Sequence, residues 1–337
     1  MRYRRMPWTF ALCAVAAFIG AATARAEVSE VRIAQQFGIS YLPLTVMHHE
    51  QLLEKAAAKV GIANLKVSWA QFGAGNTMND ALLSGNLDFP SGGVGPLLTI
   101  WSKTRGRQEV KGVASLNSMP LYLVSVNPKV RTIADLGESD RIGLPAVKIS
   151  IQAVTLQMAA AQMFGEANFA KYDALTVSMK HPDAMTAMLS GHSEINAHFG
   201  SAPFMYQELQ DTRAHRVLNS YDVLGGPHTF NVVWTTRKFH DENPRVYAAF
   251  LAALGEAMDL IHSDPKKAAA IYIEEEKSNL GPDFVEKMIR DPENVFTTAP
   301  QNVMKYADFM QKIHAIDAAP QTWQELFFPE IHSVKGS

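Results

Sequence analysis

The spacing of apolar residues changes repeatedly between two periods along the chain. Alternating or short continuous apolar stretches predict β-strands, and apolar residues three and four positions apart predict α-helices. We expect strands at 31–35, 66–71, 87–90, 110–116, 121–126, 141–144, 175–179 and 229–236. We expect helices at 42–59, 78–84, 96–102, 151–164 and 182–190, and mostly helical sequence after Pro244. This alternation predicts a layered α/β fold with mainly parallel sheets.

One pattern occurs twice, at residues 81–89 and 187–195. Each copy contains the end of an apolar helix, a glycine, an acidic residue and a short strand, and then enters a loop with Gly and Ser before a proline. Gly85 and Gly191 are expected to end the two helices, because glycine readily adopts the left-handed conformation found there. Helix–glycine–strand units are common in α/β proteins, so a chance match is the alternative to two related lobes.

Two related lobes would share the chain between them. We expect residues 27–120 and 230–337 in one lobe and 121–229 in the other, with crossings near 118–126 and 227–233. Ligands of such folds bind beyond the carboxyl ends of the strands. The loops expected at the cleft are 37–42, 72–77, 91–95, 145–150, 180–183 and 198–201.

The N-terminal segment has the pattern of a secretory signal peptide. Arginines at positions 2, 4 and 5 precede an apolar run over 8–22, and Ala24-Arg25-Ala26 fits a cleavage site. Such a run is short for a membrane span. We expect residues 1–26 to be removed and the protein to be periplasmic; an uncleaved anchor and lipidation at Cys13 are the alternatives.

Removal of that segment changes the charge and the chemistry of the chain. The segment holds four arginines and no acidic residue, which leaves 27 basic and 33 acidic residues, a net charge of −6. A mildly acidic protein is a poor candidate for binding nucleic acid or an anionic membrane. The single cysteine of the chain leaves with the segment, which excludes disulfides and cysteine-based catalysis.

A family resemblance rests on the order and spacing of several short segments. They are residues 37–44, 72–76, 81–89 and 93–96, Ile133-Ala134-Asp135-Leu136-Gly137, residues 141–145, and the helical stretches 239–249 and 257–268. Together they resemble the NitT/TauT family of ABC-transporter solute-binding proteins, which have the type II periplasmic-binding fold. The resemblance extends over nearly the whole chain after residue 26.

The resemblance implies a non-enzymatic, monomeric protein that needs no cofactor. It would bind a small molecule between its lobes and deliver it to an ABC permease in the membrane. Ligands of the family include sulfonates, taurine, nitrate, bicarbonate, aromatic carboxylates and pyrimidine or flavin precursors. We expect a small organic or inorganic anion of the sulfonate, taurine, nitrate or carboxylate class.

Four candidate ligand contacts come from an expected helix start and two loops of the first lobe. Asn76 and Thr77 begin a helix, where free amides can bind an anion; ordinary helix capping is the alternative. Gly93 lets the backbone approach a ligand, or forms a tight turn. Tyr41, in the first cleft loop, can cover a ligand face.

Further candidates open the helix of the second lobe. Relatives carry a Gly-Ser/Thr-rich turn there, but this chain reads Ala-Val-Lys-Ile-Ser-Ile-Gln over 146–152. Ser150 and Gln152 are the expected contacts, with simple helix capping as the alternative. Lys148 either pairs with an anion or is a solvated surface lysine, as most lysines are.

Two histidines complete the expected site. His181 precedes a proline at a helix start and donates to a ligand or is an ordinary loop histidine, and His198 lies in the second glycine-containing loop. We expect Lys148 or His181 to add positive charge. The spacing of the histidines matches no zinc pattern, so no metal is expected.

Enzyme motifs are scarce in this sequence. The chain lacks a nucleophile elbow, a P-loop and a dinucleotide-binding fingerprint. The alternatives to transport are a same-fold enzyme of the pyrimidine-precursor type and a periplasmic ligand sensor. Relatives of that enzyme carry a cysteine-rich iron motif and a cofactor lysine, and the absence of cysteine after residue 26 argues against it.

Overall fold

The computed structural model describes residues 26–337. The predicted signal peptide therefore lies, apart from its last residue, outside the described residues. The strands are β1 Glu30–Gln35, β2 Lys66–Gln71, β3 Ser91–Gly93, β4 Val110–Ser115, β5 Asn117–Ser118, β6 Tyr122–Ser125, β7 Ile142–Leu144, β8 Thr176–Ser178, β9 Ala197–Gly200, β10 His215–Asn219, β11 Asn231–Thr236 and β12 Val295–Phe296.

The helices cover both lobes and make up most of the C-terminal third. They are α1 Leu42–His49, α2 Leu52–Lys59, α3 Gly75–Leu83, α4 Val94–Thr104, α5 Ile151–Phe164, α6 His181–Ser190, α7 Phe204–Glu208, α8 Ser220–Leu224, α9 Arg237–Glu242, α10 Pro244–Ser263, α11 Pro265–Glu275, α12 Pro282–Ile289, α13 Val303–Lys312 and α14 Trp323–Leu326. Among these residues, no helix combines the length and the apolar character needed to cross a bilayer.

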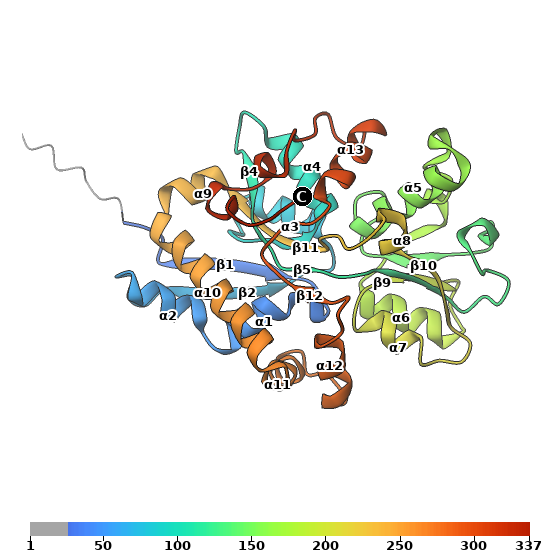
Figure 1. Ribbon diagram of the computed structural model, residues 1–337, viewed down its shortest axis with the longest axis horizontal. Coiled ribbons are helices and arrows are strands. Elements are labelled where there is room, and N and C mark those ends of the chain that lie inside the picture. The colour runs from blue at the N-terminus through green and yellow to red at the C-terminus, as the bar shows by residue number, and fades with distance from the viewer. Residues whose placement is uncertain (1–25) are drawn as a thin grey trace, which may run out of the picture.

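The two lobes have the same strand arrangement. In the second lobe one sheet has the order β10-β6-β9-β7-β8. In the first lobe β1 pairs with β2, and Ile33 of β1 forms a bridge with Phe89, two residues before β3. The sheet then continues in the order β3-β11-β4. Read from the outer parallel strand, the orders β2-β1-β3-β11-β4 and β8-β7-β9-β6-β10 correspond one to one. Figure 1 shows β9, β10 and α5–α8 together on the right and β1, β2, α1, α2 and α10 on the left.

The sheets are mixed, so the expectation of mainly parallel sheets is wrong. Of the eight strand pairs in residues 26–337, five are antiparallel and three parallel. The antiparallel pairs arise because the chain passes between the lobes twice. β6 follows the first crossing and β11 follows the second, and each is antiparallel to the parallel strands of the sheet that it joins. The crossings lie side by side, because Ser118 forms an antiparallel bridge with Thr229.

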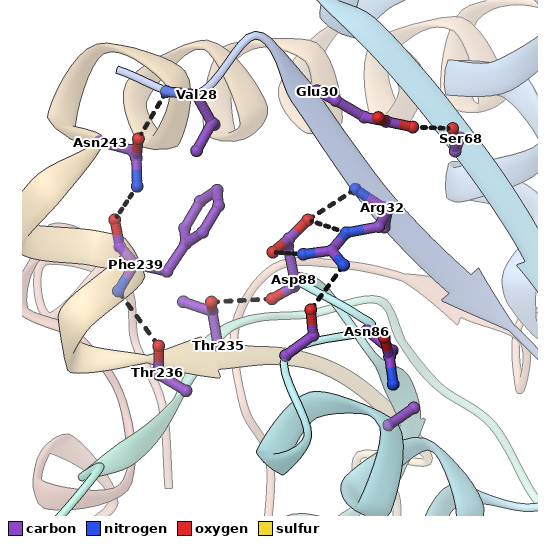
Figure 2. Close-up of polar contacts among 12 residues, drawn as sticks. Val28, Glu30, Arg32, Ser68, Asn86, Asp88, Thr235, Thr236, Phe239 and Asn243 are labelled. Carbon is purple, nitrogen blue, oxygen red and sulfur yellow. Dashed lines mark hydrogen bonds and ion pairs between the residues drawn. The ribbon is translucent and has the colours of Figure 1, made fainter. Parts of the chain in front are cut away.

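The repeated pattern marks the same structural unit in both lobes. Gly85 and Gly191 follow α3 and α6 with φ angles of +73° and +68°, as expected for glycines that end helices. Asp88 of the first copy accepts hydrogen bonds from the Arg32 backbone N–H and Nε, both at 2.9 Å, and Thr235 Oγ1 donates to the Asp88 carbonyl at 2.8 Å. Figure 2 shows how these contacts join β1, the turn after α3 and β11.

The predicted helix over 42–59 is interrupted. Gln51 adopts a left-handed conformation with φ of 51° and separates α1 from α2. The polar stretch His48-His49-Glu50-Gln51 offers no apolar side chain to hold a continuous helix against the core. The break lets both short helices pack on α10.

Candidate functional site

A small cavity lies between the two lobes. Its walls come from the ends of strands and the starts of helices in both halves of the fold. The first lobe and the second crossing contribute Gln36, Phe37, Tyr41, Gly75, Gly93, Pro96 and Phe230, and the second lobe contributes Pro145, Ser150, Ile151, Gln152 and His181. Its volume is about 10 Å³, which is room for about one water molecule.

The lobes touch directly around this cavity. The Ile39 backbone N–H donates to the Ala202 carbonyl at 3.1 Å, which links the first cleft loop to the second lobe. The Lys180 ammonium lies 5.9 Å from the centre of the Phe37 ring. A ligand larger than water can therefore enter only when the lobes separate.

Four helices begin at the cavity wall. Gly75 is the first residue of α3, Gly93 is the N-cap of α4, Ser150 is the N-cap of α5 and His181 is the first residue of α6. The first backbone N–H groups of a helix have no partner within the helix and carry partial positive charge. These four N-termini give the cavity a positive potential without any charged side chain among its lining residues.

The polar side chains of the wall are neutral hydrogen-bonding groups. Ser150 Oγ accepts from the Ala153 N–H at 3.2 Å and fixes the first turn of α5. Burial raises the pKa of the Tyr41 phenol, which keeps it protonated. Burial and the neighbouring His198 hold the pKa of His181 well below its ordinary value. The positive charge expected on His181 is therefore absent at neutral pH.

The structure brings together five of the nine predicted site residues. Tyr41, Gly93, Ser150, Gln152 and His181 line the one cavity. Their contact with a ligand stays a prediction.

The other four lie outside the cavity lining. Lys148 is exposed in a left-handed turn with φ of 64° and adds no charge to the wall. Thr77 is exposed, and its hydroxyl donates to the Ala74 carbonyl at 2.7 Å, while Asn76 is half-buried. His198 lies behind His181, at 2.8 Å between His198 Nε2 and His181 Nδ1.

Several wall residues were not predicted from the sequence. Gln36 directly follows β1, and its side chain reaches the Ser91 carbonyl at 3.5 Å. Phe230 directly precedes β11 and lies on the second crossing. Their positions next to a strand end and a crossing are the signal that could have identified them.

Comparison with known proteins places the chain in a family. Residues 24–273 match the NMT1-like family. The chain belongs to the NMT1-like family. This match and the solved structures below confirm the predicted resemblance to NitT/TauT-type solute-binding proteins. No curated protein matches the chain.

Solved structures similar to this NMT1-like protein share its two-lobed fold. The alkanesulfonate-binding protein SsuA from Xanthomonas axonopodis pv. citri, bound to MOPS, is 20% identical with a TM-score of 0.68, over 88% of this chain and 96% of that one. The periplasmic aliphatic sulphonate-binding protein SsuA from Escherichia coli is 19% identical with a TM-score of 0.65, over 90% and 92%. The ligand-binding component of an ABC-type import system from Staphylococcus aureus, with zinc bound, is 15% identical with a TM-score of 0.64, over 89% and 96%.

Proposed function

We propose that this protein is a periplasmic solute-binding protein that carries a small anion to an ABC-type importer. The observation that carries the proposal is the convergence of four helix N-termini and neutral hydrogen-bonding side chains on one cavity between the lobes. Each N-terminus favours a negative charge by roughly 0.3–1 kcal/mol, and by more where it is buried. A sulfonate, nitrate or carboxylate would accept hydrogen bonds from them, and hydrogen bonds to ionised acceptors are the strong kind.

Delivery would use the movement of the lobes. An anion that contacts α3 and α4 from one lobe and α5 and α6 from the other gains its full set of donors only in the closed form. Its binding therefore shifts the open–closed equilibrium toward closure. The closed form would then dock on the permease, and the similarity in fold to the ligand-binding component of an ABC-type import system supports this role.

Binding, rather than catalysis, is the activity that this wall supports. It presents neutral donors and apolar side chains, and its single histidine is held neutral by burial. The chain also lacks the cysteines that the alternative pyrimidine-precursor enzyme would need, since its only cysteine is Cys13.

A thermal-shift screen tests the ligand class. A ligand that binds only the native state raises the melting temperature, by several degrees at concentrations far above Kd. We expect a sulfonate, nitrate or carboxylate to raise it, and a neutral pyrimidine of similar size to leave it unchanged. Cells that lack the protein should then lose uptake of the stabilising anion at low external concentration; unchanged uptake would favour a sensing role.

A further inference from the structure

Four buried side chains form a continuous chain of hydrogen-bonding groups that leads away from the cavity. Gln152 Nε2 lies 3.3 Å from His181 Nε2, and His181 Nδ1 lies 2.8 Å from His198 Nε2. His198 Nδ1 in turn contacts Glu208 Oε1. The chain begins at the cavity wall and ends on a carboxylate of α7, which lines no part of the cavity.

The surroundings hold these groups in place and keep water away. His181 is 5% exposed, and His198 and Glu208 are fully buried. The Phe204 ring stacks on His181 at 5.7 Å between centroids. Gly200 leaves room for the His198 ring, because a Cβ at that position would lie 2.9 Å from His198 Cε1.

The geometry fixes the direction of every hydrogen bond once Glu208 is ionised. Its carboxylate accepts from His198 Nδ1–H, so His198 Nε2 carries a lone pair that accepts from His181 Nδ1–H. His181 Nε2 then also carries a lone pair, and it meets the Gln152 amide and the cavity as an acceptor. In this state the Glu208 charge has no cation beside it, and Glu208 Oε2 has no partner among residues 26–337.

One added proton reverses these roles. The proton binds to His181 Nε2 from the cavity side, and His181 passes its Nδ1 proton to His198 Nε2. His198 becomes an imidazolium beside the Glu208 carboxylate, and the charge of the buried carboxylate is compensated, which is favoured at a buried site. His181 stays neutral but now presents Nε2–H, a donor, to the cavity, and the Gln152 amide turns so that its oxygen, in place of its nitrogen, faces this proton.

We propose that His198 and Glu208 are positioning residues of the ligand site, which store the proton that turns His181 into a donor, so that anion binding takes up one proton. This inference rests on the proposed anion-binding function. The low pKa of His181 agrees with it, because burial disfavours a charge on that ring and the proton is held on the His198–Glu208 pair instead.

Few other titratable groups face this relay. Lys180 is the N-cap of α6 and Asp183 lies in its first turn, and the contact from α5 is made by Gln152, which does not titrate. Tyr122 is the only titratable residue of β6 and β7, the strands that pair with β9, and Tyr206 is the other titratable residue of α7. Beyond α7, Asp211 and Arg213 pair with each other at 2.7 Å. The pH dependence of binding should therefore come from the His181–His198–Glu208 relay.

Calorimetry with nitrate and methanesulfonate tests the coupling, because neither probe titrates between pH 5.5 and 8.5. We expect the affinity to rise as pH falls, by up to tenfold per pH unit where one proton is linked. Titrations in two buffers of different ionisation enthalpy should show uptake of close to one proton. Glu208→Gln should abolish both effects, whereas His192→Gln, which alters an exposed histidine outside the relay, should keep them.

A second measurement needs neither a ligand nor the variant. Nitrogen-15 NMR of the ligand-free wild-type protein should show His198 gaining a proton and His181 changing tautomer while staying neutral as pH falls. If neither probe binds but these changes occur, the proposed ligand class fails and the relay stands. The relay is contradicted if His181 keeps one tautomer throughout, or if the affinity depends on pH equally in wild type and Glu208→Gln.

Discussion

Gly93 of the first lobe lies against Ile151 of the second with no space for a side chain between them. A Cβ at Gly93 would lie 2.7 Å from Ile151 Cγ2 and 2.9 Å from its Cβ. The Gly93 φ of −64° is ordinary for any residue, so the need for glycine comes from the facing lobe and not from the local backbone. Contact between the lobes, and with it closure, depends on this absent side chain.

Gly93→Val should therefore disfavour the closed form. We expect at least a tenfold loss of anion affinity in calorimetry and a larger radius of gyration by small-angle X-ray scattering in the presence of ligand. Gly255→Ala is the matched control, because a Cβ there meets no atom within 4 Å. Equal affinity of Gly93→Val and wild type would show that closure at this contact plays no part in binding.

Ser150 combines helix capping with a place in the cavity wall, and these two roles can be separated. Ser150→Ala should lose about 1 kcal/mol of unfolding free energy, the typical value of an N-cap, and about tenfold in anion affinity. Thr236→Ala removes the cap of α9, where Thr236 Oγ1 accepts from the Phe239 N–H at 3.1 Å away from the cavity. The Thr236→Ala protein should lose a similar amount of unfolding free energy and keep its full affinity for the anion. Unchanged anion affinity of the Ser150→Ala protein would show that Ser150 does not contribute to the site.

His228 makes stability depend on pH. Burial lowers its pKa to about 4, against an ordinary value near 6.5. As pH falls, His228 takes up a proton in the unfolded chain before it does so in the folded protein. The free energy of unfolding that is present above about pH 6.5 is therefore lost between about pH 6.5 and pH 4. The loss from this group is about 3 kcal/mol in full. Urea unfolding at pH 7, 5.5 and 4.5 should show a smaller decrease in His228→Gln than in wild type, and an unchanged profile would contradict this role.

Glu27, the predicted first residue after cleavage, is bound to the start of α10. Its carboxylate accepts from the backbone N–H groups of Arg245 at 3.1 Å and Val246 at 2.8 Å, and from Arg245 Nε at 2.9 Å. Its side chain is only 6% exposed. Glu27→Gln should lower the unfolding free energy by about 1–2 kcal/mol, because it weakens charge-assisted hydrogen bonds.

The control for Glu27 is the exposed Glu30, which accepts a hydrogen bond from Ser68 (Figure 2). Glu30 also forms an ion pair with Lys66 on the surface. Glu30→Gln should change the unfolding free energy much less than Glu27→Gln does, because a surface ion pair contributes little to stability. Urea unfolding of both variants measures the difference. Equal effects would show that Glu27 does not act as a cap.

The sequence predicted the helix ends and strands where local chemistry decides the conformation. The helix stops at Gly85 and Gly191 and the helix over 151–164 agree with the structure, because a left-handed glycine and an apolar helix face are local signals. The expected loop at 198–201 was wrong: β9 spans Ala197–Gly200, between β6 and β7. Its glycine suggested a loop, but strand pairing to two distant segments decides the outcome, and pairing leaves no signal in a short window.

The candidate site shows the same limit. Ser150, Gln152 and His181 lie at the wall because each stands at the start of a predicted helix, and helix starts follow strand ends in this fold. Lys148 was expected at the site, but its side chain is exposed to solvent. Its backbone before α5 is left-handed and directs the side chain away from the cavity. Glu208 had no local signal, since its contact with His198 depends on how α7 packs beside β9.

Isothermal titration calorimetry of the wild-type protein with a sulfonate, nitrate and a carboxylate tests whether the cavity between the lobes binds an anion. We expect saturable binding of at least one of these anions at one site per chain, unaffected by Lys148→Ala because that side chain lies outside the cavity, and weakened at least tenfold by Ser150→Ala. Tight binding of a neutral or cationic compound with all three anions silent would contradict it.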